Sequence, residues 1–195
     1  MNHRNTLMKS WVLKMREEDK LYFSPIHTFA DVAEALERND RKMLLEAFAA
    51  RVNGFYLNPA KVLDEKKLGF GCGLLCAATI DFLAKIVYPD EGSTERIPFW
   101  LADNIKEFSR KDFAKRFYED FRCGLVHEGR IKRTGEFSYG TETIVTASDG
   151  IIRINPRILL EKVRQAFEEY LQLLKTDNQG FETYKAYLRK YFMEK

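Results

Sequence analysis

Cysteine is scarce in this sequence, which limits how covalent links or metal ions can stabilise it. Three cysteines, Cys72, Cys76 and Cys123, are too few and too odd in number for a disulfide framework. Cys72 and Cys76 stand one helical turn apart, but a zinc site needs further ligands and the chain holds only three histidines. We therefore expect reduced, mostly buried thiols in a cytoplasmic protein, with no structural metal.

A large excess of charge of one sign is also missing. The net charge is +3, and the 195 residues are 45% hydrophobic and 31% charged. This composition is typical of a soluble globular protein, and the length suits a single domain over residues 1–195 with a substantial core. The mild positive balance permits contact with phosphate without requiring it. A case for nucleic acid binding must therefore rest on local clusters of charge.

Long hydrophobic runs are limited to one segment. The basic opening, MNHRNTLMKSWVLKM, lacks an apolar stretch of signal-peptide length and a small-residue cleavage site. The segment from Leu68 to Tyr88 is long enough to cross a membrane. However, it contains Asp81 and Lys85, and each would cost about 3 kcal/mol near the centre of a bilayer. We therefore interpret it as a buried central helix and expect no contact with a membrane.

Helical periodicity, in contrast, extends through most of the chain. Thr28 is placed to cap one helix, and a second amphipathic run follows it and is expected to stop at Gly54. The next stretch, FYLNPAKVL, is interpreted as a loop or short turn. The apolar helix GFGCGLLCAATIDFLAKIV then ends at Pro89, and YPDEGSTERIP is interpreted as a polar connection.

A helix with a broad aromatic face is predicted next. Ser109 and Asp112 match the S-x-x-[DE] capping signature that marks its start. Its apolar residues recur every four positions and predict a buried face. These residues are Phe113, Phe117, Phe121 and Leu125.

The periodicity changes in the region of about residues 130–155. Two short β-branched runs, TIVTAS and IIRIN, flank Asp149-Gly150 and predict a β-hairpin. Asn155 is then expected to cap a long amphipathic helix with Pro156 in its first position, and a last helix is expected after Gly180. The sequence thus predicts an all-α bundle that carries one inserted β-hairpin.

Two features of the apolar helix invite a functional interpretation. GFGCGLL has the look of a phosphate-binding glycine loop, but Leu74 stands where the dinucleotide motif needs glycine, so we favour glycines used for close packing. Asp81 lies mid-helix among apolar residues and needs a partner, either Lys85 or an arginine on a facing helix. We favour a structural ion pair for Asp81 over a role in a site.

The stretch YEDFRCGLVHEGRIK holds Arg122 and His127, two side chains able to act on a phosphodiester. Residues five apart in an ideal α-helix are separated by about 140° around its axis. The two side chains therefore converge only if the helix loosens near Gly124 or if Arg122 reaches across. Spacing alone favours the alternative, in which Arg122 bridges to Glu119 and His127 closes the helix C-terminus.

Basic residues bracket this pair in the sequence. Such clusters are what binding to a phosphate backbone requires, although solvated charge on an exposed helix explains them nearly as well. The cluster before the pair is Arg110, Lys111, Lys115 and Arg116, and the cluster after it is Arg130, Lys132 and Arg133. Among these residues, Arg116, Arg130, Lys132 and Arg133 are the candidates for RNA binding.

The segment FRCGLVHEG, at the end of an amphipathic helix, resembles the R-x(4–6)-H motif of the HEPN superfamily, with Arg122 and His127 in the motif positions. The similarity is closest to the small bacterial HEPN proteins carried on plasmids and mobile elements. It implies an antiparallel helical bundle that dimerises, with two R-x-H pairs facing each other across a cleft. It further implies cleavage of RNA without a metal or other cofactor. Many members act as toxins or phage-defence effectors, which implies an antitoxin or regulatory protein as a further partner.

Elementary chemistry assigns roles to these residues. When the ribose 2′-hydroxyl is the nucleophile, His127 can serve as base or acid because imidazole titrates near neutral pH. Arg122 would hold the phosphate oxygens, and Glu128 would orient the histidine. The sequence therefore predicts a homodimeric, metal-independent endoribonuclease. The alternatives are a non-catalytic dimeric module that binds RNA, nucleotide or a partner protein, and a helical scaffold in which the pair only closes a helix end.

Overall fold

The structure, a computed structural model, describes residues 21–133 and 135–193 and is mostly helical, with 73% helix and one small sheet. The predicted helical fold with a hairpin is confirmed at this level, whereas the basic opening segment lies outside the described residues. The chain divides into two compact units. One comprises residues up to Phe55 together with those from Leu171 onward, and the other comprises Tyr56–Tyr170. The single-domain interpretation stays a prediction.

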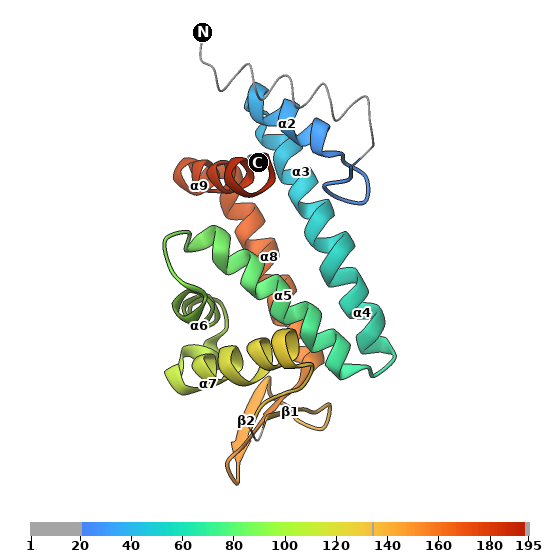
Figure 1. The fold of residues 1–195 in the computed structure, drawn as a ribbon, viewed down its shortest axis with the longest axis vertical. Helices are drawn as coiled ribbons and strands as arrows, with labels where there is room; N and C mark the ends of the chain where they lie inside the picture. The colour runs from blue at the N-terminus through green and yellow to red at the C-terminus, as the bar shows by residue number, and fades with distance from the viewer. Residues whose placement is uncertain (1–20, 134, 194–195) are drawn as a thin grey trace. The chain divides into compact units, whose positions relative to one another are not determined.

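The first unit is built from helices with strong N-terminal caps. Thr28 accepts a hydrogen bond from the Asp31 amide and donates its own amide to the Asp31 carboxylate, so the predicted cap is confirmed. Phe48 stacks on Tyr184 with 4.5 Å between ring centroids. Asp177 caps the last helix, which therefore begins before Gly180. The elements of this unit, labelled in Figure 1, are α2 (Phe29–Arg38), α3 (Arg41–Val52), the last turns of α8 (Pro156–Thr176), α9 (Asn178–Leu188) and the π-helical turn η5 (Arg189–Met193).

The predicted stop at Gly54 is wrong. The chain passes from α3 into a π-helical turn, η1 (Asn53–Leu57), and on into α4 (Asn58–Glu65), so the predicted loop is helical. Proline is tolerated in the first turn of α4 because its missing N–H has no partner to lose there. Gly54 instead allows close packing, since a Cβ at this position would lie 2.3 Å from Cγ of Pro25.

The second unit contains the predicted apolar helix, α5 (Gly69–Val87), whose inward face is buried. By length and composition α5 could cross a membrane, and half of its most apolar stretch is buried within the structure. The polar connection predicted before the aromatic helix is wrong for the most part, because Ser93–Asn104 form helix α6, which has Pro98 inside it. Helix α6 packs against α5 on one side and α7 (Lys111–Arg116) on the other (Figure 1).

The aromatic helix is confirmed in its buried face and corrected at its start. Phe113, Phe117, Phe121 and Leu125 are all buried. Ser109 ends a short 3-10 turn, η2 (Lys106–Ser109), and the residue before α7 is Arg110, which makes no side-chain cap. The predicted capping role of Ser109 is therefore wrong.

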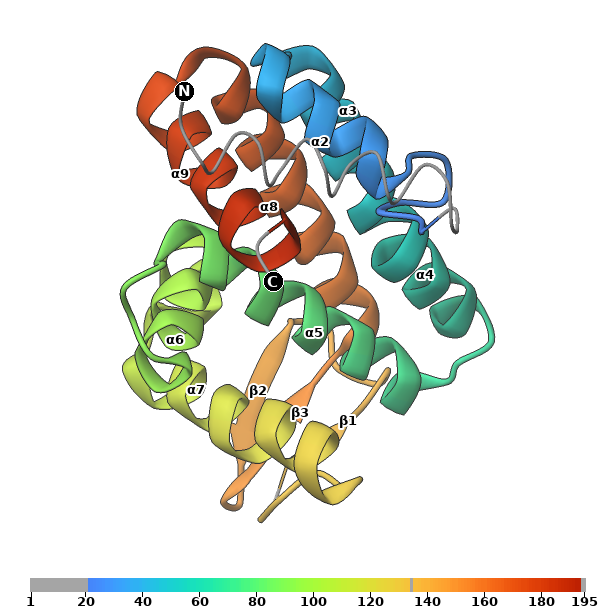
Figure 2. The same cartoon turned by 45° about the horizontal axis from the view of Figure 1, so that its top comes forward.

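The small sheet contains the predicted hairpin and one additional strand. Its strands are β1 (Gly135–Phe137), β2 (Val145–Ser148) and β3 (Ile151–Ile154), in the order β1-β3-β2 (Figure 2). The antiparallel β2–β3 pair turns at Asp149-Gly150, where φ is 53° and 77°. These positive angles are those of a type I′ turn.

Strand β1 pairs parallel to β3 and brings an aromatic side chain against α5. The ring centroids of Phe137 and Phe121 are 5.2 Å apart. A Cβ added at Gly73, in α5, would lie 2.0 Å from the Phe137 ring. Gly73 therefore lets the sheet approach the helix, which supports packing as the role of the glycines in GFGCGLL. Asn155 accepts hydrogen bonds from the amides of Arg157 and Ile158, which confirms the predicted start of α8.

We predict that Gly150→Ala lowers the free energy of unfolding by about 1–2 kcal/mol, because an L side chain is strained in the left-handed region. No atom lies within 4 Å of the added Cβ, so the cost is one of backbone conformation alone. Urea denaturation gives the value. Gly140→Ala, in the connection between β1 and β2 and without a positive φ, is the control, and equal unfolding free energies for the two variants would contradict the assignment.

Candidate active site around Arg122 and His127

The segment that carries Arg122 and His127 leaves α-helical geometry. After α7, two π-helical turns follow, η3 (Phe117–Arg122) and η4 (Gly124–Glu128). A π-helix joins residue i to residue i+5, so side chains five apart lie nearly above one another, in place of the separation of about 140° in an α-helix. The helix thus changes to π-helical bonding in the segment that carries Arg122 and His127, as their convergence requires.

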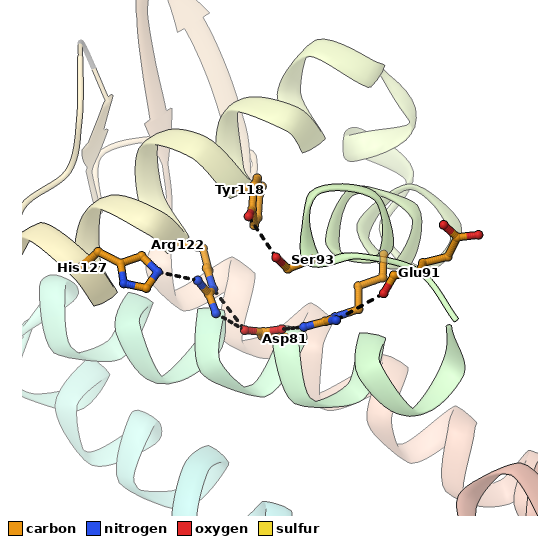
Figure 3. A network of polar contacts seen from close by, with 7 residues as sticks. Asp81, Glu91, Ser93, Tyr118, Arg122 and His127 are labelled. Atoms are coloured by element: carbon orange, nitrogen blue, oxygen red, sulfur yellow. Dashed lines mark hydrogen bonds and ion pairs between the residues drawn. The ribbon is translucent and has the colours of Figure 1, made fainter. Parts of the chain in front are cut away.

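As a result, the two side chains meet. Nη1 of Arg122 lies 3.0 Å from Nε2 of His127 (Figure 3). A guanidinium has only donors, so His127 can share this hydrogen bond only as its acceptor, through an Nε2 that carries no proton. His127 is exposed to solvent. The geometry therefore presents an unprotonated imidazole nitrogen beside a permanent positive charge.

Behind this pair, Asp81 holds the other edge of the guanidinium. Its Oδ2 accepts hydrogen bonds from Nε of Arg122, at 3.1 Å, and from Nη2. Its Oδ1 accepts from Nη2 of Arg96 at 3.0 Å, and Arg96 also donates to the backbone oxygen of Glu91 (Figure 3). The expectation that Asp81 pairs with an arginine on a facing helix is confirmed, and two arginines fill that role.

The electrostatics of the site follow from this pairing. Burial acts to lower the pKa of Arg122, but the hydrogen bond and the charge of Asp81, together with contact to Cys123, raise it above its ordinary value. Arg122 consequently cannot act as a proton donor or acceptor at any physiological pH. Its chemistry is limited to hydrogen bonding and charge.

A second polar contact fixes α6 beside the turns that carry the site. Ser93 and Tyr118 are joined by a hydrogen bond of 3.0 Å between their hydroxyl oxygens (Figure 3). The sequence does not reveal Ser93 and Arg96 as neighbours of the pair, since the segment that holds them is not recognised as a helix. The sequence asks only that Asp81 have a partner, Lys85 or an arginine on a facing helix, and Arg96 is one such arginine.

Gly124, the first residue of the second turn, is required for the chain to fold back on itself. It is buried, and its carbonyl accepts a hydrogen bond from the amide of Arg130 at 3.2 Å. A Cβ at this position would lie 2.4 Å from the Arg130 carbonyl oxygen. Gly129 ends the second turn in the left-handed region, at φ 66°. Glycine is therefore needed at each end of the reversal that follows His127.

The four residues predicted to bind RNA are all paired with carboxylates. Arg116 contacts the buried Asp120 at 3.0 Å, and Arg133 contacts Glu119 at 3.2 Å and Asp120 at 3.4 Å. Arg130 and Lys132 contact the same acid, Glu128, at 2.7 Å and 2.6 Å respectively. The structure thus pairs these cations with acids of their own segment, which compensate much of their charge.

In the described part of the chain, the ion-pair partners of Glu128 are Arg130 and Lys132, and its predicted role in orienting His127 stays a prediction. The hydrogen bond from Lys132 lowers the pKa of Glu128, and the charge of Arg130 adds to the effect. The partner of His127 is Arg122. The geometry therefore gives Glu128 the task of holding two cations on the loop that follows the site.

No cluster suited to a metal ion accompanies these side chains. Within the residues that the structure describes, His, Cys, Asp and Glu form no group of three or more that could hold a metal. Cys72 and Cys76 are buried and Cys123 is half-buried, all as free thiols. What the site offers is one imidazole, two guanidinium groups and the carboxylate between them.

A separate cavity of about 370 Å³ lies between α4 and the start of α8. None of the predicted site residues lines it. Its walls are Asn58, Lys61, Asp64, Arg157, Leu160, Glu161 and Arg164. His127 lies at the protein surface instead, where an extended polymer has easier access than it has to a cavity.

No protein-family model, curated protein or solved structure matches this chain. The chemistry of the site therefore carries the functional argument.

We predict that Gly124→Ala lowers the free energy of unfolding by about 1–3 kcal/mol, because the added methyl group meets a backbone carbonyl that cannot rotate away. Gly71→Ala is the matched helical control, since its Cβ meets only the flexible end of Leu63 at 3.1 Å. That variant should be neutral or gain slightly from helix propensity. Urea denaturation of both proteins measures the free energy of unfolding. A Gly124→Ala protein as stable as wild type would contradict the close approach of Gly124 to the Arg130 carbonyl.

Proposed function

We propose that this protein is a metal-independent endoribonuclease of HEPN type that acts as a cytoplasmic homodimer. The observation that carries the proposal is the contact of 3.0 Å between Nη1 of Arg122 and Nε2 of His127 at the surface. A neutral imidazole can accept the proton of a ribose hydroxyl, and the adjacent guanidinium can stabilise the charge that then develops on phosphorus-bound oxygen.

The charge of the site supports a phosphodiester as ligand. Arg96, Asp81 and Arg122 together carry one excess positive charge, and a neutral His127 adds none. A single phosphodiester carries one negative charge and so balances this cluster. Arg122 still has N–H groups free of Asp81 and His127, because a guanidinium carries five of them.

The proposed reaction uses the 2′-hydroxyl next to the scissile phosphate. When phosphate binds, Nη1 of Arg122 transfers its hydrogen bond from Nε2 of His127 to a non-bridging oxygen. The freed Nε2 takes the hydroxyl proton while the 2′ oxygen forms a bond to phosphorus. The bond from phosphorus to the 5′ oxygen breaks, and that oxygen receives a proton from an imidazolium. The products are a 2′,3′-cyclic phosphate and a 5′-hydroxyl, so no co-reactant is consumed.

Two proton transfers favour two imidazoles, and a second copy of the chain is the proposed source of the acid. The HEPN resemblance adds the proposal that the enzyme is a toxin or phage-defence effector controlled by an antitoxin or regulator.

The flanking cations are proposed to bind the RNA strand on either side. Residues 110–133 contain eight Lys or Arg against four Asp or Glu, so this segment holds four excess positive charges in a chain whose net charge is +3. Approach of phosphate would draw Arg130 and Lys132 from Glu128, an exchange that requires little free energy because exposed ion pairs are weak.

The first test of the function is RNA cleavage in the presence of EDTA. We predict that His127→Ala lowers the cleavage rate by about 10²- to 10⁴-fold, the usual contribution of general acid–base catalysis. The control is His27→Ala, which removes a histidine bonded to Ser24 in the other unit and should leave the rate unchanged. Products are to be assayed for cyclic phosphate ends.

Equal rates for wild type and His127→Ala would remove this residue from the mechanism. Saturable RNA binding by the wild-type protein without any cyclic phosphate would instead identify the non-catalytic binding module. A substrate with deoxyribose at the cleavage point should bind and remain intact.

A second prediction separates the two roles considered for Glu128. If it only holds cations, Glu128→Gln releases Arg130 and Lys132 and should tighten RNA binding by up to about fivefold, since exposed ion pairs are weak. Fluorescence anisotropy with a non-cleavable RNA at low salt measures this. Unchanged affinity together with a large drop in cleavage rate would restore the orienting role for this residue.

A further inference from the structure

Asp81 occupies an unusual position, between two guanidinium groups from different elements. It projects from the middle of α5, Arg96 reaches it from α6, and Arg122 reaches it from η3 (Figure 3). The side chains are largely buried, with 19%, 16% and 17% of their surface exposed in the order Asp81, Arg96 and Arg122. All three belong to the unit that spans Tyr56–Tyr170.

The contacts divide the donors of Arg122 into two sets. Asp81 occupies the edge formed by Nε and Nη2, whereas Nη1 faces His127. A guanidinium is planar and rigid, so a carboxylate that holds one edge also fixes the direction of the remaining nitrogen. The position of Nη1 relative to the imidazole is therefore set by Asp81.

Arg96 in turn fixes Asp81. It holds Oδ1 at 3.0 Å and is itself anchored at the backbone oxygen of Glu91 at 3.3 Å. Within the described part of the chain, Nε of Arg96 is buried and has no hydrogen-bond partner. Both hydrogen bonds of Arg96 are made by its Nη atoms, and together they restrain the Asp81 carboxylate.

We propose that Asp81 is a positioning residue, which orients Arg122 so that its Nη1 meets Nε2 of His127 and holds that nitrogen unprotonated, and that Arg96 locks Asp81 in place. The catalytic half of this inference rests on the proposed ribonuclease function. The structural half, that Asp81 controls the tautomer of His127, does not depend on it.

The experiment replaces the charge of Asp81 with minimal change of shape, as Asp81→Asn. Nitrogen-15 NMR of the imidazole in the full chain, without RNA, reports which ring nitrogen carries the proton. We expect His127 to hold its proton on Nδ1 in the wild-type protein and to shift toward the Nε2-protonated form in Asp81→Asn. An unchanged tautomer in the variant would overturn the proposal.

The matched control is Asp64→Asn. Asp64 is also a buried acid in the same unit, paired with Arg157 at 2.9 Å, but it lies outside the network of Arg122 and His127. It should affect stability in a similar way and leave the His127 tautomer as in wild type. If Asp64→Asn shifts the tautomer equally, the effect is one of general destabilisation and the proposal is wrong.

Should Asp81→Asn fail to fold, Arg96→Gln tests the same relation with Asp81 left charged. It should shift the tautomer in the same direction by a smaller amount, with Arg157→Gln as its control. A tautomer unchanged in Arg96→Gln would overturn the locking role of Arg96.

Activity supplies the second readout. With RNA, Asp81→Asn should lower kcat by about 10- to 100-fold, as loss of the outer partner of a site residue commonly does, and leave KM nearly unchanged. Asp81→Glu, which keeps the charge, should recover part of this loss. A tautomer shift in a protein whose wild type cleaves no RNA would support the positioning role and reject the ribonuclease, so the two claims fail separately.

Discussion

The change from α-helical to π-helical bonding after α7, over η3 and η4, is the constraint on which the site depends. An α-helix would direct Arg122 and His127 to different sides, and the apolar side chains of the same segment would still be buried. The π-helical turns keep Phe117 and Phe121 in the core while they bring the two polar side chains together. Such turns are less favourable than regular helix and occur frequently at functional sites.

Charge burial is the second cost that this site imposes on the fold. An unpaired Asp81 carboxylate would strongly destabilise the fold, because α5 is an apolar helix. Arg96 and Arg122, which come from elements far apart in the sequence, both pair with it. Asp120 is similarly placed, fully buried and held by Arg116 and Arg133. Both acids hold arginines of the same segment, so the electrostatics of the core and of the site cannot be separated.

Local signals in the sequence predict the elements whose causes are local. Thr28 with Asp31, Asp149-Gly150, and Asn155 with Pro156 each act within a few residues, and each is found as expected. The signals fail where distant contacts decide. Helix α6 carries an internal proline and a polar first half, and β1 has three residues that pair only because Phe137 packs on α5.

The candidate site shows the same division. Arg122 and His127 can be identified from their residue types and spacing. Their contact depends on a π-helical turn, which residue preferences do not predict. The role of Arg96 is hidden because it depends on the packing of α6 on α5. The basic residues predicted on both sides of the pair are present, but Glu119, Asp120 and Glu128 neutralise much of their charge. Only the folded loop determines which acid pairs with which base.

The most direct measurement is a crystal structure of the protein bound to an RNA with deoxyribose at the cleavage point. We predict that the scissile phosphate lies within about 3 Å of Nη1 of Arg122, with Nε2 of His127 facing the 2′ position. Strand contacts to Arg130 and Lys132 are expected in place of their pairing with Glu128. A phosphate bound elsewhere, such as in the cavity beside Lys61 and Arg164, with His127 left in solvent, would contradict the assignment of this site.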